Sequence, residues 1–143
     1  MKIKIVNKSN NELPQYQTKG SSGMDLRADL KEDIILKSLE RTLVPTGIYL
    51  ELPEGYEAQV RARSGLALKK GLSLPNGIGT IDSDYRGELK VIMVNLGRED
   101  IVIQNGDRIA QLVIMKYERA DIELVENLSD SERQDGGFGH TGI

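Results

Sequence analysis

The chain has 143 residues, a formal net charge of −3, one histidine and no cysteine. This composition excludes disulfides, thiolate metal ligands and a multi-histidine metal site, and it argues against a general nucleic-acid or membrane-surface binder. No apolar run approaches the ~20 residues of a membrane span and the start is no signal peptide, so we expect one cytoplasmic domain in which any metal is Mg²⁺ or Ca²⁺ met by oxygens.

Fifteen glycines and few good helical stretches predict an all-β domain. Alternating or apolar runs between turn residues predict strands at residues 2–6, 24–28, 33–36, 41–44, 46–52, 56–62, 72–74, 77–81, 88–95, 101–103, 108–116 and 122–125. Only residues 64–71 have the composition of a helix, with Ser64 as N-cap and Gly71 as C-terminal stop. The spacing of the turns favours a closed sandwich or a barrel-like fold.

Residues 76–95 have the pattern of a β-hairpin with an unusually polar tip at residues 82–87. Asp82 and Asp84 are interpreted as a carboxylate pair, a cation site or turn-capping residues, the last being common for aspartate. Tyr85 is either a core anchor or a ring that faces a ligand. The chemistry at this tip exceeds what the closure of a turn requires.

Two further places suggest anion binding. Arg63, Ser64 and Gly65 join the end of a strand to a helix start, where free N–H groups and the positive dipole end favour phosphate; an ordinary cap with a solvated arginine is the alternative. Gln111 lies in a strand that is apolar on both faces, and an unpartnered buried amide costs about 1–3 kcal/mol. Its side chain is therefore expected to be hydrogen-bonded, most simply to the backbone.

The last residues differ in character from the rest, so we divide the chain into a β domain, residues 1–127, and a flexible tail, residues 128–143. The tail contains the only phenylalanine and the only histidine of the chain. Phe138 between glycines, with Arg133 before it and Thr141 after it, suits stacking on a base while a guanidinium and N–H groups contact phosphates. A simple mobile end is the alternative.

Taken together, five segments resemble, in order and spacing, the five motifs of the homotrimeric dUTPase family. They are SGMDLRA (22–28), RSGLA (63–67), NGIGTIDSDYRGE (76–88), GDRIAQLV (106–113) and RQDGGFGHTG (133–142). The resemblance implies a β-clip or distorted jelly-roll subunit in a homotrimer with shared active sites. Each site would take the first, second and fourth motifs from one subunit, the third from another and the tail from the last.

The implied reaction is hydrolysis of dUTP to dUMP and pyrophosphate by Mg²⁺-assisted water attack on the α-phosphorus, which keeps uracil out of DNA and supplies dUMP for thymidylate synthesis. Carried over by position, Asp82 would be the catalytic base and Asp25 would contact Mg²⁺ through water. The triphosphate would be bound by Arg63, Ser64, Gly65, Gln111, Arg133, Gly139, His140 and Thr141. The base and sugar would contact Asn76, Gly79, Tyr85, Lys90 and Phe138.

Selectivity has a physical basis in this assignment. Tyr85 under the sugar would leave no room for a 2′-hydroxyl, and thymine's methyl group would collide with the glycine-rich strand at Gly77 and Gly79. Cytosine inverts the donor and acceptor pattern read by Asn76 and the backbone, and such unpaired groups are worth about 10⁴–10⁵ in discrimination.

His140 departs from the pattern, because the family usually has serine there; a histidine beside phosphates predicts a pH-sensitive closure of the tail. Three other readings compete. A dCTP deaminase shares the fold but lacks this YRG segment and this tail, an inactive nucleotide-binding trimer would have no need of Asp82, and a structural β trimer leaves the Phe-Gly tail unexplained.

Overall fold

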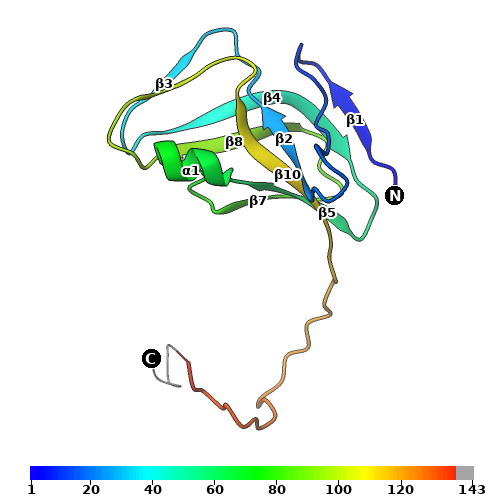
Figure 1. Cartoon of the computed structure of the whole chain (residues 1–143). Coiled ribbons are helices and arrows are strands. Elements are labelled where there is room, and N and C mark those ends of the chain that lie inside the picture. The colour runs from blue at the N-terminus through cyan, green and yellow to red at the C-terminus, as the bar shows by residue number, and fades with distance from the viewer. Residues whose placement is uncertain (138–143) are drawn as a thin grey trace.

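The computed structural model describes residues 1–137 and is built from two four-stranded sheets, a small two-stranded sheet and one short helix (Figure 1). The first sheet has the order β1 (Lys4–Asn7), β4 (Arg41–Glu51), β8 (Glu88–Asn95), β6 (Leu72–Ser73). The second has the order β2 (Gly23–Arg27), β10 (Arg108–Lys116), β5 (Tyr56–Arg61), β7 (Ile78–Ile81). The small sheet pairs β3 (Ile34–Leu36) with β9 (Ile101–Ile103), and every pairing is antiparallel.

The hydrophobic core lies between these sheets and takes residues from all three. Val44, Val91 and Met93 come from the first sheet, and Leu26 and Leu112 come from the second; each is at most 1 % exposed. In β5 and the first half of β8, alternate residues are buried, as a strand period of two requires. The prediction of an all-β fold with one short helix is confirmed, and nearly all strands fall where the sequence predicts them.

The helix α1 spans Ser64–Lys70 and differs from the prediction at its start. Its N-cap is Arg63, not Ser64, because Arg63 has an extended backbone (φ −93°, ψ 123°) and its carbonyl accepts the first helical hydrogen bonds. No side chain caps this end. At the other end Gly71 adopts φ 71°, the left-handed conformation that suits glycine, so the predicted stop is confirmed.

The predicted hairpin at residues 76–95 is wrong. β7 pairs with β5 in one sheet, whereas β8 pairs with β4 and β6 in the other. The loop of residues 82–87 therefore carries the chain from one sheet to the other instead of closing a pair of strands. Local alternation identified both strands correctly, but strand partners are set by contacts distant in sequence, which alternation does not encode.

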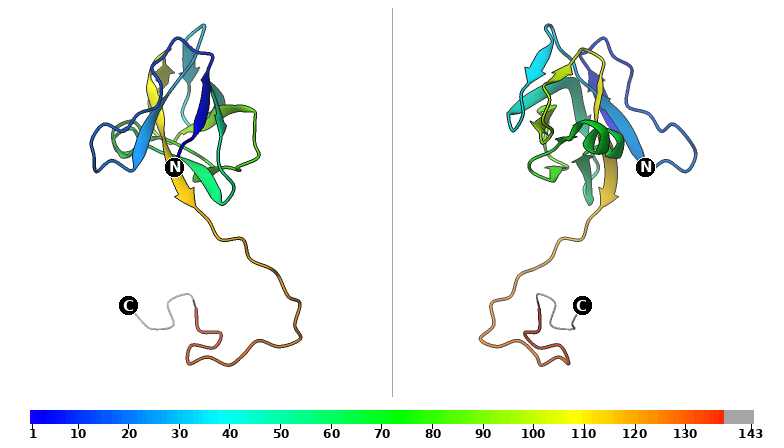
Figure 2. Two further views of the ribbon diagram at one scale, coloured as in Figure 1. Left: turned by 90° about the vertical axis from the view of Figure 1, so that its right-hand side faces the viewer. Right: turned by 60° about the vertical axis from the view of Figure 1, so that its left-hand side comes forward.

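The strand predicted at residues 122–125 is also absent. The chain leaves the body after β10, and residues 118–135 are exposed along an extended path (Figures 1 and 2). Ile122 and Leu124 alternate with acidic residues as a strand would, but nothing in residues 1–137 pairs with them, and they are 91 % and 98 % exposed. Two separate strands predicted at 41–44 and 46–52 are one strand, β4, whose pairing with β8 shifts between Pro45 and Tyr49.

The part of the chain that the structure describes contains no helix long and apolar enough to cross a membrane.

Candidate active site

A cavity of about 420 Å³ opens where β2, β10 and the start of α1 meet. It brings together five of the residues that the sequence marks for phosphate or metal: Asp25, Arg63, Ser64, Gly65 and Gln111. The remaining lining residues are Gln17, Gly23, Leu66 and Lys69. Segments that are up to 94 positions apart in the chain, from Gln17 to Gln111, thus line one cavity. We call this site the anion pocket.

The register of the second sheet explains why these segments meet. Gln111 on β10 lies directly opposite Asp25 on β2 and opposite Arg61 on β5. Residues opposite one another in antiparallel strands direct their side chains to the same face, so Asp25 and Gln111 share a face. β5 then ends at Arg61, and α1 begins at Ser64 beside the same face. Strand pairing and the start of α1 soon after β5 together bring these segments to one pocket.

Gln111 is fixed at its position by two neighbours. Its Nε2 donates a hydrogen bond to the carbonyl of Ala62 at 2.9 Å, which confirms the expected backbone partner. Its Oε1 lies so close to Gly23 that a Cβ at that position would overlap it. Glycine at position 23 thus makes room for the amide side chain of the facing strand and does not serve an unusual backbone conformation.

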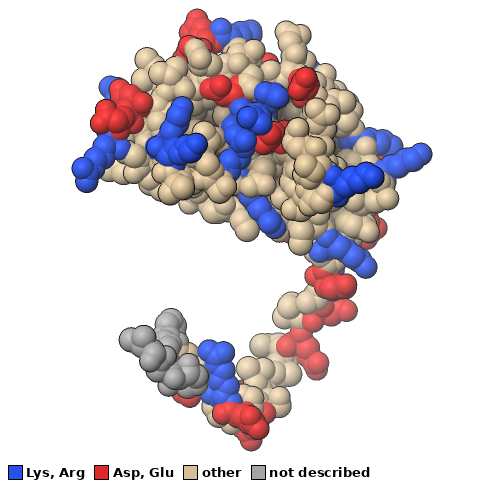
Figure 3. Space-filling model, in the orientation of Figure 1, with Lys and Arg blue, Asp and Glu red and all other residues tan. Residues whose placement is uncertain are grey.

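Arg63 and Asp25 form the charged pair of the pocket. The Nε of Arg63 lies 3.0 Å from Oδ1 of Asp25, and the two side chains are only 27 % and 18 % exposed. The first N–H groups of a helix lack intrahelical acceptors, so the exposed Ser64 and Gly65 offer backbone donors beside this pair. Figure 3 shows positive side chains gathered across this face between α1 and β2, with acidic atoms among them. Such an arrangement suits a ligand with several negative charges.

Two lining residues were missed from the sequence. Lys69 lies four positions after Gly65, a spacing that puts both on one side of a helix, so helical periodicity could have found it. Gln17 lies in the irregular segment before β2, and no sequence pattern marks it.

Asp82 does not belong to this pocket. With Asp84 and Arg86 it lines a separate cavity of about 550 Å³, together with Ser83, Leu52, Glu54, Tyr117 and Arg119. The loop of residues 82–87 follows β7, whose Ile81 lies opposite Ala58 near the start of β5. Arg63 comes after the end of β5, five positions further along the chain than Ala58. By this register, Asp82 and Arg63 lie near opposite ends of the six-residue strand β5.

The loop of residues 82–87 is shaped by its own side chains. The N–H of Tyr85 donates to the carbonyl of Asp82 at 3.2 Å, and Nη1 of Arg86 donates to the carbonyls of Ser83 and Tyr85 at 2.7 and 3.0 Å. These contacts show that Arg86 shapes the turn. The Tyr85 hydroxyl donates to the carbonyl of Glu88 at 3.1 Å. Tyr85 remains 45 % exposed, so it is no core anchor.

Gly87 has a role that the sequence did not reveal. A Cβ there would overlap the Tyr85 ring, so only glycine lets the ring fold back across the loop. By contrast, Gly77 has a φ of 69° and no atom within 4 Å of its would-be Cβ, so its turn conformation explains it. A Cβ at Gly79 would meet Val60 at 3.3 Å.

Gly79 lies on β7, which is an edge strand of the second sheet, and Asn76 lies in the turn just before it. Nδ2 of Asn76 donates to the carbonyl of Ile78 at 3.4 Å. Lys90 lies on β8 in the other sheet, exposed, with its Nζ 3.5 Å from Glu88. The structure thus places these three predicted base- and sugar-binding residues away from the lining of the anion pocket.

The tail is only partly described. Nε of Arg133 donates to the carbonyl of Gly136 at 2.7 Å, and Arg133 is exposed. The segment after β10 leads away from the body (Figure 2). The other predicted tail residues, Phe138, Gly139, His140 and Thr141, lie outside the described residues.

The donor set for a metal is sparse. Within residues 1–137 no three acidic or histidine side chains lie together as a metal site would require. Asp25 is the only carboxylate of the anion pocket, and its oxygens face arginines. This set does not fit a cation enclosed by protein ligands. It fits Mg²⁺ that retains most of its waters and is bound chiefly by substrate phosphates.

Comparison with known proteins gives a consistent result. The family described as dUTPase matches residues 9–142. The chain is 61 % identical to the deoxyuridine 5'-triphosphate nucleotidohydrolase of Finegoldia magna, covering 99 % of both chains. It is 55 % identical to the protein of the same name from Fusobacterium nucleatum, covering 99 % of this chain and 97 % of that one. Among solved structures, the dUTPase of Staphylococcus bacteriophage 80alpha with dUpNHpp aligns with a TM-score of 0.87, 26 % identity and 99 % coverage of each chain.

Proposed function

The chain belongs to the dUTPase family, and on that premise we propose how its residues divide the work of the reaction. It is a dUTP diphosphatase, which hydrolyses dUTP to dUMP and pyrophosphate. In the cytoplasm this activity would keep uracil out of DNA and supply dUMP for thymidylate synthesis. The observation that carries the assignment of residues is the anion pocket, which unites three of the five family motifs.

The anion pocket binds the triphosphate. Arg63 offers a guanidinium, which matches phosphate oxygens in geometry and charge, and Ser64 and Gly65 offer backbone N–H groups. Arg63 is already held by Asp25 at 3.0 Å, so little side-chain freedom is lost when a phosphate binds. Gln111, fixed by Ala62 and Gly23, adds a neutral polar contact. Lys69 supplies a further positive charge at the rim.

The catalytic aspartate comes from another copy of the chain. A water that attacks the α-phosphorus must lie within hydrogen-bond reach of its base, about 2.6–3.2 Å. By strand register, Asp82 and the Arg63 of the same chain lie near opposite ends of β5 and line separate cavities, so they are farther apart than this reach. A homotrimer in which Asp82 of one subunit meets the anion pocket of the next removes this mismatch.

Exposed apolar side chains support this assembly. Leu43 and Ile92 lie directly opposite each other on the two central strands of the first sheet and are 52 % and 40 % exposed. Ile122, Leu124 and Leu128 in the segment after β10 are almost fully exposed. Exposed apolar side chains often mark contacts between proteins, and neighbouring subunits would bury these.

Base recognition uses the edge of β7. An edge strand presents unpaired N–H and C=O groups, and these match the alternating donors and acceptors of uracil. Gly79 keeps that edge free of a side chain, and Asn76 adds an amide. Tyr85, exposed and folded against Gly87, supplies the flat surface that contacts the sugar and rejects a 2′-hydroxyl. Lys90 contributes a cation beside this region.

In the chemical step, Asp82 accepts a proton from the attacking water as the water oxygen bonds to the α-phosphorus. The bond from the α-phosphorus to the oxygen that bridges to the β-phosphate breaks, and pyrophosphate leaves with that electron pair. Arg63 and the donors of the pocket stabilise the negative charge that develops on the leaving group. Bound Mg²⁺ would neutralise and align the phosphates, with Asp25 contacting it through water.

The tail completes the site. We assign Arg133, Gly139, His140 and Thr141 to the phosphates and Phe138 to the base, with residues 128–143 acting as a closing segment and residues 1–127 as the β domain. A chain that ends at residue 127 should remain a folded oligomer yet turn over dUTP at a rate lower by roughly 10². Full activity of this truncated chain would contradict the assignment. A KM for dUTP whose pH profile between about 5.5 and 8 is unchanged in His140→Ser would remove the proposed role of that histidine.

The decisive experiment incubates the protein with Mg²⁺ and, separately, dUTP, dCTP, dTTP and UTP, and measures pyrophosphate. We expect release from dUTP alone. Ammonia from dCTP would indicate the deaminase instead, and tight binding of dUTP without pyrophosphate would indicate an inactive nucleotide-binding trimer.

A further inference from the structure

Asp25 is held from two sides. Its Oδ1 lies 3.0 Å from Nε of Arg63, and its Oδ2 lies 3.3 Å from Nη1 of Arg108. The carboxylate is 18 % exposed, whereas the Arg108 side chain is 50 % exposed. Each carboxylate oxygen therefore has its own arginine, which restrains both the position and the rotation of the group.

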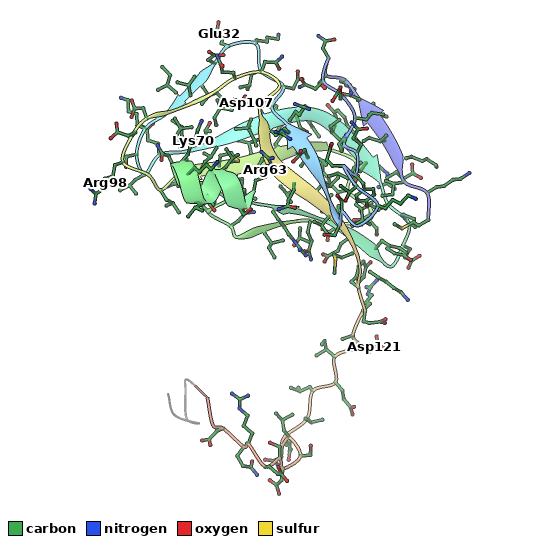
Figure 4. The ribbon with its side chains drawn as sticks, in the orientation of Figure 1. Glu32, Arg63, Lys70, Arg98, Asp107 and Asp121 are labelled. Atoms are coloured by element: carbon green, nitrogen blue, oxygen red, sulfur yellow. The ribbon has the colours of Figure 1, made fainter. Side chains whose placement is uncertain are left out.

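Arg108 contributes to this arrangement twice. Besides its guanidinium, its backbone carbonyl accepts a hydrogen bond from Nη1 of Arg63 at 3.0 Å. Arg63 is thus fixed through Nε by Asp25 and through Nη1 by Arg108. Of the five N–H groups of a guanidinium, three remain for phosphate. Figure 4 shows Arg63 at the start of α1, next to β10 and β2.

An irregularity in β10 brings Arg108 to this face. Arg108 pairs with Arg27 and Ala110 with Leu26, so Ile109 is an extra residue, a β-bulge. In a regular strand, residues three apart direct their side chains to opposite faces, and Arg108 would point away from Gln111. The bulge adds one residue and places both on the face of Asp25.

Arg108 lies next to the anion pocket but does not line it. It does not line the 420 Å³ cavity, but it lines a smaller neighbouring cavity of about 200 Å³ together with Arg63 and Lys70. Arg63 lines both cavities. Its pair with Asp25 is the link through which Arg108 acts on the pocket.

We propose that Arg108 is a positioning residue for the triphosphate, which the bulge at Ile109 aims at Asp25 so that Asp25 and Arg63 are held in a phosphate-binding arrangement. This inference rests on the proposed function of the anion pocket. Arg108 makes no contact with substrate; it reduces the freedom of the groups that do. Because a misplacement of about 1 Å in a binding group is costly, loss of this restraint weakens triphosphate binding.

The test compares Arg108→Gln with Arg98→Gln, which removes the same charge from an exposed loop position far from the pocket (Figure 4). In Arg108→Gln, we expect the KM for dUTP to rise about tenfold, with kcat changed less than about threefold. The inhibition constant of dUMP, which has a single phosphate, should change less than about twofold, and the melting temperature should match that of Arg98→Gln.

The contact to Asp25 is a single nitrogen–oxygen pair, so Arg108→Lys can supply it and should recover most of the loss in KM. If Arg108→Gln does not fold, Arg108→Met, which retains the aliphatic stem, takes its place with the same expected values. A KM within twofold of the control, equal losses for dUTP and dUMP, or no recovery with lysine would each overturn the inference. Wild-type protein that releases no pyrophosphate from dUTP would instead refute the proposed function.

Discussion

The anion pocket and the loop of residues 82–87 carry the two halves of the proposed chemistry, and they are organised differently. In the pocket, side chains from three distant segments hold one another: Asp25 with Arg63, and Gln111 with Ala62 and Gly23. In the loop, the hydrogen bonds are local, as between Arg86 and the carbonyls of Ser83 and Tyr85. The pocket is complete within one chain, whereas the loop presents its groups outward.

This difference indicates which half depends on assembly. A binding pocket held by contacts between β2, β5 and β10 exists as soon as the subunit folds. Asp82 is exposed and lines a separate cavity, so in the proposed mechanism it acts only where another surface is brought to it. Binding and catalysis should therefore respond separately to mutation.

Asp82→Asn is expected to give the largest difference between the effect on catalysis and the effect on binding. Without a base the attacking water is not deprotonated, so kcat should fall by roughly 10²–10⁴. Affinity for a non-hydrolysable dUTP analogue should change less than about twofold, since the anion pocket is untouched. Steady-state kinetics and calorimetric titration measure the two quantities. A parallel loss of affinity would mean that the two regions are not separable.

Gly23→Ala is expected to have a smaller effect, which falls on binding instead of catalysis. The new Cβ would displace the amide of Gln111, a flexible side chain that can move without disrupting the fold. Analogue affinity should fall about 10- to 100-fold, the value of a hydrogen bond to a charged group, with little change in melting temperature. Gly20→Ala is the matched control, because no atom lies within 4 Å of its Cβ position. Equal behaviour of the two variants would refute the role given to Gln111.

The smallest effect is expected from Gly87→Ala in the loop. Its Cβ would push the Tyr85 ring from its position, while Asp82 and the anion pocket stay in place. Turnover of dUTP should change little, but the preference for dUTP over UTP should fall about tenfold because the sugar contact loosens. The ratio of kcat/KM for the two nucleotides measures this. An unchanged ratio would remove Tyr85 from sugar discrimination.

The sequence predicted the positions of strands and the helix well, but it predicted poorly which strands pair with one another. Alternation located β8 and β10 with their observed ends, and Gly71 marked the end of α1, because these signals lie within a few residues. Alternation also suggested that residues 76–95 pair with one another, which is wrong, since β7 and β8 belong to different sheets. Residues 122–125 have the alternating pattern of a strand, but the structure has no strand there.

The candidate site divides in the same way. Asp25, Arg63 and Gln111 were identified through motif order, and the register of the second sheet brings them together. Arg108 was predicted only as the first residue of a strand, because the bulge that turns it toward Asp25 has no sequence pattern of its own. Glycines 23 and 87 are explained only by the side chains of Gln111 and Tyr85 that approach them.

The account's central claim is that each site combines the anion pocket of one subunit with Asp82 of another, and subunit mixing tests it directly. Asp82→Asn retains an intact pocket and Arg63→Gln retains an intact base, and each variant alone should be nearly inactive. When the two are co-expressed in equal amounts and assemble at random, about one quarter of the sites should combine both intact parts and recover activity. Recovery to roughly that fraction of wild-type pyrophosphate release is the predicted result. Mixed assemblies that stay as inactive as either variant alone would contradict the account.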